Sequence, residues 1–175
     1  KTKVIMLINV LGISTDVKKI VNYAKKKNII VIEDNCEALG ARIDNKYLGT
    51  LGDFGTYSFF YSHQITSGEG GMIVCNNKQD YEILLALRSH GWSRGKNTYA
   101  KNLRKYPNLD PRYIFINSGF NLRPTDIQAA IGRNQLKKLE TLKRNRTINK
   151  SKIISGLMKD ERWNGQFKFV EYSKR

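Results

Sequence analysis

The sequence predicts an α/β fold in which a mostly parallel sheet is flanked by helices. Two short apolar runs, Lys3–Gly12 and Ile29–Asp34, show no polar alternation, which is typical of strands buried on both faces. Between them, Ser14–Asn28 begins with Ser, Thr and Asp and has apolar residues at helical spacing. A strand, a helix and a strand in this order form a right-handed unit with two parallel strands.

The segments that follow indicate two more strands and two helices. Phe54–Tyr61 alternates in polarity, and Gly70–Asn76 is a second strand-like run. Asp80–Gly91 and Arg123–Leu157 have the periodicity of helices. Ser93–Asn117, which lies between these two helices, is polar, basic and irregular, and this composition predicts a long loop or excursion.

Composition limits the classes of function. The 175 residues, 40% of them hydrophobic, suffice for one domain, and a chain that starts without methionine is expected to be a fragment. The formal net charge of +16 would suit nucleic acid, but Lys and Arg are spread along the chain, which favours solvated helix faces. The sequence has no run of ~18 apolar residues that would span a membrane. Two cysteines cannot build a disulfide framework or a four-thiolate metal site, and we expect a cytoplasmic protein.

Several polar residues lie beyond the carboxyl ends of strands, where α/β sheets bind ligands. Asp34 directly follows a strand and could meet a ligand cation, such as the protonated ring nitrogen of pyridoxal phosphate, or could only cap a turn. Glu37 would face the same pocket if this segment forms a helical turn. Ser58 could bind phosphate, and Ser67–Gly71 is glycine-rich without a Walker or dinucleotide fingerprint. A lone histidine such as His63 is more often structural than catalytic.

Two blocks of sequence resemble one family. "VIEDNCEALGARIDNKYLGTLGDFGTYSFFYSHQITSGEGGMIVCN" (residues 31–76) and "SGFNLRPTDIQAAIGRNQLKKL" (residues 118–139) are similar, in this order, to the DegT/DnrJ/EryC1/StrS sugar aminotransferases. The resemblance implies the large domain of a fold-type I pyridoxal-phosphate enzyme over residues 1–134. Residues 135–175 would form a long helix and the start of a C-terminal small domain. Where the family has a lysine that binds the cofactor covalently, this sequence has His63.

An imidazole cannot form an imine with the cofactor aldehyde, so covalent aminotransferase chemistry is blocked at this position. One branch of the family has histidine here and removes the C3 hydroxyl of nucleotide-linked 4-keto-6-deoxyhexoses, for dideoxysugars of surface polysaccharide. The resemblance to this branch implies pyridoxamine phosphate bound non-covalently, with His63 as the base in proton transfer. It also implies that Asp34 holds the pyridinium nitrogen, that Glu37 contacts the cofactor, and that Ser58 binds its phosphate. Asn121 would reach that phosphate across a homodimer interface.

Weaker candidates for shaping the sugar site are Ser62, Arg94 and Phe115. Each has an equally good structural explanation: Ser62 as a turn hydroxyl, Arg94 as an exposed cation and Phe115 as a ring in the core. With no cysteine after Cys75, the sequence resembles the subtype without an iron–sulfur cluster. That subtype acts on a GDP-linked rather than a CDP-linked sugar and takes its amino group from L-glutamate. No metal, nucleic acid or membrane is expected as a partner. Two alternatives stay open: a nucleotide-sugar aminotransferase, and a non-catalytic basic module on the same fold.

Overall fold

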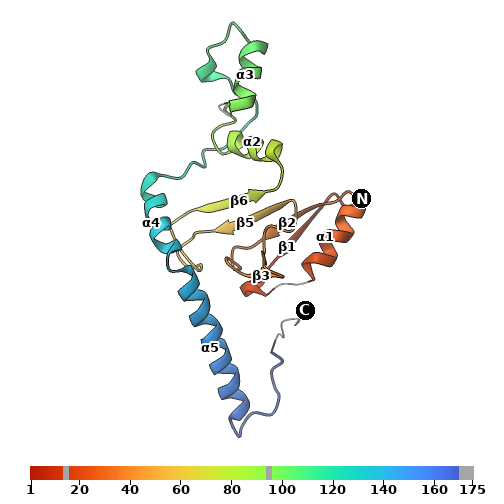
Figure 1. Ribbon diagram of the computed structural model, residues 1–175, viewed down its shortest axis with the longest axis vertical. Helices are drawn as coiled ribbons and strands as arrows, with labels where there is room; N and C mark the ends of the chain where they lie inside the picture. Colours follow the sequence, from red (N-terminus) through yellow and green to blue (C-terminus); the bar gives the residue numbers. More distant parts are fainter. Residues whose placement is uncertain (14–15, 94–95, 170–175) are drawn as a thin grey trace.

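A four-stranded sheet with the order β1-β2-β5-β6 forms the centre of the molecule in the computed structural model, which describes residues 1–13, 16–93 and 96–169 (Figure 1). β1 (Val4–Ile8), β2 (Ile30–Asp34) and β5 (Phe54–Ser58) are parallel, and β6 (Gly71–Cys75) is antiparallel to β5. Helix α1 (Val17–Lys26) connects β1 to β2. The predicted α/β fold with a mostly parallel sheet is confirmed.

The two faces of the sheet are covered differently. On one face, Leu7 and Val21 pack against a core of three buried side chains: Val17, Ala38 and Leu48. On the other face, Val4, Met6 and Ile8 of β1 are 46%, 57% and 58% exposed. The expectation that β1 is buried on both faces is therefore wrong for the described residues. β1 is an edge strand, and its continuous apolar run gave no sign that one side is open.

A buried carboxylate holds the loop that precedes β5. Glu33 is fully buried, and its carboxylate accepts hydrogen bonds from the backbone N–H groups of Gly49 (2.8 Å), Leu51 (2.8 Å) and Gly52 (2.6 Å). The Tyr57 hydroxyl donates to the Leu48 carbonyl at 2.6 Å, and burial raises the pKa of this tyrosine. Gly49 has a φ of 93°, and a Cβ there would overlap the Tyr57 hydroxyl, so this close approach requires glycine.

Two short strands, β3 (Arg42–Ile43) and β4 (Lys46–Tyr47), pair antiparallel beside the sheet. Their two-residue turn consists of Asp44 and Asn45, which have φ values of 45° and 63°. These residue types tolerate the left-handed region and are common in such hairpin turns. The hairpin contributes Ile43 to the edge of the core.

The segment expected to be an irregular excursion contains a helix. After α2 (Lys78–Leu87), the chain forms α3 (Lys96–Lys105) and a short 3-10 helix (Pro111–Tyr113), so the absence of helix in this segment was a wrong prediction. α3 projects beyond the sheet (Figure 1), and its apolar residues, Tyr99, Ala100 and Leu103, are few among basic and polar ones, so the helix was missed. Two isolated β-bridges, Ser89–Asn121 and Trp92–Phe115, close the base of the excursion.

The single helix predicted over Arg123–Leu157 is two helices. α4 (Asp126–Leu136) begins with a capping box between Thr125 and Gln128, and α5 (Leu139–Lys159) follows after a break at residues 137–138. Neither Gly nor Pro stands at the break, so the sequence carried no signal for it. In Figure 1, α5 extends away from the sheet.

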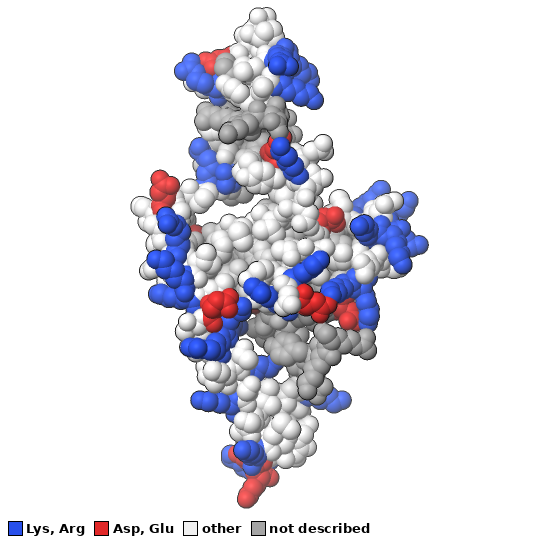
Figure 2. Space-filling model, viewed as in Figure 1, with Lys and Arg blue, Asp and Glu red and all other residues white. Residues whose placement is uncertain are grey.

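Basic side chains are not gathered in one patch on the face of the molecule that Figure 2 shows. On the face shown in Figure 2, Lys and Arg form separate groups, interrupted by Asp and Glu. This distribution supports solvated helix faces as the origin of the net charge. Among the described residues, no helix is long and apolar enough to cross a membrane.

Candidate active site

A small cavity of about 190 Å³ lies where β1 and β2 end. Ile8 and Val10 form its apolar wall, and its polar lining consists of Asn9, Asp34, Cys36, Glu37 and His63. Three of the predicted site residues, far apart in the sequence, therefore meet in one cavity: Asp34, Glu37 and His63. Its position beyond the carboxyl ends of parallel strands is where α/β sheets bind ligands.

Asp34 is the last residue of β2, and its side chain organises the turn that follows. Its Oδ1 accepts a hydrogen bond from the Cys36 backbone N–H at 3.0 Å, which is an Asx turn. Burial, together with the neighbouring Asp34 carboxylate, raises the pKa of the Cys36 thiol to about 11. The Cys36 thiol in the cavity is therefore neutral at physiological pH.

Glu37 is held by a strained segment of backbone. The Ala38 N–H donates to the Asn35 carbonyl at 3.0 Å, and this turn places Glu37 at the cavity. Glu37 Oε2 accepts a hydrogen bond from the Leu11 N–H at 2.9 Å, and Leu11 has a φ of 55°. A leucine in the left-handed region is uncommon, and such strain is concentrated at functional sites. The Gln64 side chain donates to the Glu37 carbonyl and connects the His63 turn to this segment.

His63 lies in the turn between β5 and β6. Its backbone N–H donates to the Phe60 carbonyl at 3.1 Å, and the Phe60 ring meets the imidazole edge to face, with centroids 5.9 Å apart. The imidazole Nδ1 is buried and has no hydrogen-bond partner. Buried polar atoms are nearly always paired, so this nitrogen is available to a ligand or to a transferred proton.

Ser58 ends β5 on the same face of the sheet as Asp34. Asp34 pairs in register with Thr56, and side chains two residues apart on a strand share a face. Ser58 Oγ accepts a hydrogen bond from the Phe60 N–H at 3.2 Å. Ser58 does not line the cavity, but it stands at the same end of the sheet.

The structure does not bring the remaining predicted residues to the cavity. Ser62 is exposed in the His63 turn. Phe115 is 49% exposed and packs against Trp92 with a centroid distance of 5.8 Å. Asn121 pairs with Ser89 at the base of the excursion, and Arg94 lies outside the described residues.

The cavity contains two residues, Asn9 and Cys36, that were not among the predicted site residues. Asn9 directly follows β1, so the strand-end rule that selected Asp34 would also have found it. Cys36 carried no comparable signal, because a single buried cysteine is usually a small apolar residue.

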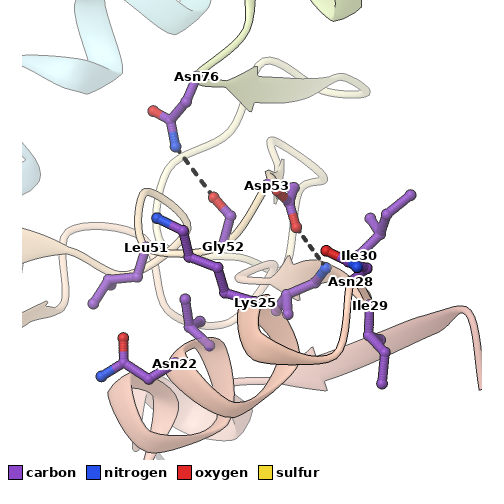
Figure 3. Close-up of a pocket in the computed structure, with 11 residues that line it drawn as sticks. Asn22, Lys25, Asn28, Ile29, Ile30, Leu51, Gly52, Asp53 and Asn76 are labelled. Carbon is purple, nitrogen blue, oxygen red and sulfur yellow. Dashed lines mark hydrogen bonds between the residues drawn. The ribbon is translucent and has the colours of Figure 1, made fainter.

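A larger cavity of about 610 Å³ lies at the opposite end of the sheet, between α1 and the starts of β2 and β5 (Figure 3). Two of its polar side chains form hydrogen bonds with the backbone of neighbouring segments. Asp53 Oδ2 accepts from the Val31 N–H at 2.8 Å, and Asn76 Nδ2 donates to the Gly52 carbonyl at 3.1 Å. The amino ends of parallel strands are not where α/β sheets bind their ligands, so the smaller cavity is the candidate site.

Comparison with known proteins identifies the family. Residues 1–168 match the DegT/DnrJ/EryC1/StrS aminotransferase family. The chain belongs to this family. The resemblance seen in the sequence is thereby confirmed, and members of the DegT/DnrJ/EryC1/StrS family are the relatives to which the site can be compared.

Three relatives illustrate the range of likeness. The GDP-4-keto-6-deoxy-D-mannose 3-dehydratase of Yersinia pseudotuberculosis is 40% identical over 162 residues, which cover 89% of this chain and 41% of that protein. The GDP-perosamine synthase of Escherichia coli O157:H7 is 39% identical, covering 80% of this chain and 34% of that protein. The solved E. coli GDP-4-keto-6-deoxy-D-mannose-3-dehydratase with bound hydrated PLP is 38% identical with a TM-score of 0.65, covering 79% and 36% of the two chains.

Two further structures of a GDP-4-keto-6-deoxymannose-3-dehydratase hold GDP-perosamine or a trapped PLP-glutamate geminal diamine, each at 37% identity and a TM-score of 0.66, with 79% of this chain and 36% of that chain covered. This chain spans about two fifths of the length of its first curated relative. Within the described residues, no three His, Cys, Asp or Glu side chains gather as metal ligands.

Proposed function

We propose that the protein is a pyridoxal-phosphate-type 3-dehydratase of a GDP-linked 4-keto-6-deoxyhexose, with L-glutamate as amino donor. The observation that carries this proposal is His63. In the candidate site, an imidazole lies beside Asp34 and Glu37, and no lysine is among the described cavity residues. The similarity to the two dehydratases supports the substrate class, because both relatives are named for a GDP-linked 4-keto-6-deoxy sugar.

The residues present fit a pyridoxamine phosphate cofactor. Asp34 offers a carboxylate at the end of a strand, as a protonated ring nitrogen requires. The cavity lining is mostly polar, with Asn9, Asp34, Glu37 and His63 among its side chains, as a polar and charged group requires. Ser58, at the same end of the sheet, has a hydroxyl proton to donate to a phosphate oxygen.

Each residue has a separate role in the proposed reaction. When bound, pyridoxamine phosphate supplies an amine for the sugar keto group and a ring that accepts electrons. Asp34 keeps a proton on the ring nitrogen, Glu37 orients the cofactor, and Ser58 binds its phosphate. His63 accepts a proton at an imidazole nitrogen, which suits a group whose ordinary pKa is near neutrality.

Several features of the whole enzyme belong to the same proposal. We infer a cytoplasmic homodimer in which Asn121 reaches the phosphate of the partner subunit's cofactor, and in which Ser62, Arg94 and Phe115 shape the sugar site. We also infer that residues 1–134 belong to the large domain and that 135–175 lead into a small domain, because α5 departs from the sheet. We also infer the subtype without an iron–sulfur cluster, because this sequence has no cysteine after Cys75.

A nucleotide-sugar aminotransferase is the second candidate. The specific observation in its favour is the 39% identity to GDP-perosamine synthase, nearly equal to that of the leading dehydratase. The two candidates differ in what happens at the sugar: a dehydratase removes the C3 hydroxyl, whereas an aminotransferase leaves an amino sugar. Product analysis therefore separates them.

The first prediction concerns His63→Asn. Full-length protein is incubated with pyridoxal phosphate, L-glutamate and GDP-4-keto-6-deoxymannose, and products are identified by mass spectrometry. We expect a 3-deoxy product from the wild type, and a loss of at least ~100-fold in turnover with cofactor binding retained in the variant, because only the base is removed. Borohydride treatment should leave no cofactor attached to a lysine.

His90→Asn is the matched control, since His90 has a φ of 62°, which asparagine tolerates, and lies outside the cavity. It should keep full activity. His63→Lys should restore a borohydride-reducible linkage and favour transamination. An amino-sugar product from the wild type, with cofactor trapped on a lysine, would contradict the dehydratase and support the second candidate; no cofactor binding at all would support a non-catalytic module.

A further inference from the structure

Asn9 is a fully buried amide at the end of β1. It is 1% exposed, and its backbone N–H donates to the Asp34 carbonyl at 3.0 Å, which fixes it beside the proposed cofactor residue. Its side-chain nitrogen donates to Asn35 Oδ1 at 2.8 Å. Asn9 also lines the cavity that contains His63.

The hydrogen bonds of Asn35 determine which way the Asn9 amide faces. Asn35 is fully buried, and its Nδ2 donates to the Glu33 carbonyl at 2.9 Å. A carbonyl only accepts, so the Asn35 amide cannot be reversed, and its Oδ1 must accept from Asn9 Nδ2. The Oδ1 of Asn9 is therefore directed away from Asn35, and it is buried without a hydrogen-bond partner.

Two residues of the cavity lining thus each carry one buried atom without a hydrogen-bond partner: Asn9 Oδ1 and His63 Nδ1. An amide oxygen can only accept a hydrogen bond, whereas a neutral imidazole carries one N–H on either of its nitrogens. The two atoms complement each other only when the imidazole proton is on Nδ1. The cavity of about 190 Å³ also has room for a bridging water, whose share of liquid volume is about 30 Å³.

We propose that Asn9 is a positioning residue that selects the Nδ1–H tautomer of His63. Its Oδ1 accepts from Nδ1–H, directly after a small side-chain rotation or through one water, and Nε2 is left unprotonated as the base. The inference rests on the proposed function for the role of the base, but the tautomer itself is independent of the reaction. Asp34, Glu37 and the neutral thiol of Cys36 are the other titratable groups that face this cavity.

The test reads the tautomer by nitrogen-15 NMR of the full-length protein labelled at histidine, with the His63 signals assigned by their loss in His63→Asn. The wild type should show a protonated Nδ1 and an unprotonated Nε2 in neutral solution. Asn9→Leu removes the acceptor and should populate the Nε2–H tautomer. Asn9→Asp keeps an acceptor oxygen and should retain Nδ1–H.

Kinetics provide a second readout. Asn9→Leu should lower kcat by roughly 10- to 100-fold with little change in KM, by analogy with the loss of an outer partner of a metal-binding histidine. Asn102→Leu is the matched control, because Asn102 is also a buried amide, 8% exposed and bonded to Ser93 at 2.6 Å, but lies outside the cavity. It should leave the His63 tautomer unchanged.

Two results would overturn the inference. The first is a wild-type spectrum with the His63 proton on Nε2. This result needs no variant, so it decides the question even if Asn9→Leu fails to fold. The second is an Asn9→Leu protein that folds and keeps the wild-type tautomer of His63. If the wild type makes no 3-deoxy product, the proposed function fails, while the spectra still decide the role of Asn9.

Discussion

Glu33 and Asp34 are adjacent carboxylates with opposite environments. Glu33 points to the covered face of the sheet, where three backbone N–H groups satisfy it, and Asp34 points to the other face at the cavity. Successive side chains of a strand point to opposite faces of the sheet, so these two neighbours in β2 have different surroundings. Glu33, which stabilises the fold, and Asp34, the proposed cofactor ligand, therefore stand side by side at the end of β2. Asp34 also contributes to the raised pKa of the Cys36 thiol.

The second prediction concerns the pH dependence of Cys36. Burial and Asp34 raise its pKa from 9.0 to about 11, so alkylation by iodoacetamide should be slow at pH 8 and should rise steeply only toward pH 11. A raised pKa also means that the stability from the neutral thiol is present below pH 9 and is lost as the pH rises to about 11.

The rate is measured by mass spectrometry in a Cys75→Ser background, in which Cys36 is the remaining thiol of this chain. Cys36→Ser in the same background gives the zero of the assay. Half-maximal alkylation near the ordinary pKa of 9.0 would show that Cys36 is more accessible to water than the structure indicates.

At the scale of elements, the strands and α1 were predictable because their signals are local. Apolar runs marked β1 and β2, and residues directly after strands marked Asp34. α3 has a weaker signal, because its only apolar residues, Tyr99, Ala100 and Leu103, stand in a short, strongly basic segment. The meeting of His63 with Glu37 also depends on turns whose geometry is set by Gln64 and Leu11, and no sequence pattern encodes those contacts.

The third prediction tests the element that Glu33 holds. Glu33→Gln places an amide N–H₂ where a carboxylate oxygen accepts, so at least one buried backbone N–H loses its partner. The free energy of unfolding should fall by about 2–3 kcal/mol, as expected for a lost hydrogen bond to a charged group. Urea unfolding followed by circular dichroism measures this change.

Glu140→Gln is the control, since Glu140 is 73% exposed in its pair with Lys143, and exposed pairs contribute roughly 0–1 kcal/mol. Equal unfolding midpoints for the two variants would show that Glu33 does not hold the loop. A second check is hydrogen exchange: the amides of Gly49, Leu51 and Gly52 should lose protection only in Glu33→Gln.

At the scale of the molecule, a large net positive charge coexists with an open apolar face of the sheet. The charge of +16 keeps copies apart in low salt, while exposed Val4, Met6 and Ile73 on one face favour association. The register places these side chains on the same side as Asp34, because Val4 pairs with Ile30 and Thr56 with Ile73. Salt therefore determines which effect dominates.

The fourth prediction follows for the isolated 175-residue polypeptide. Self-association should increase with salt, because screening weakens the repulsion between copies and leaves the apolar attraction. Light scattering after size exclusion measures the mass, and fluorescence of a bound apolar dye measures the open face. The paired variant Val4→Lys and Met6→Lys should reduce both, whereas Leu157→Lys on α5 should not. A monodisperse monomer at all salt concentrations would contradict the prediction.

The two β-bridges that close the base of the excursion make the path from Trp92 to Phe115 a loop whose ends are fixed together. The free energy of closing such a loop grows only with the logarithm of its length, by about 0.6 kcal/mol for each doubling. Insertions or deletions near residues 106–110 should therefore leave the pairing of β5 with β6 intact. The length of this segment can therefore change without a change to the sheet that positions the cavity.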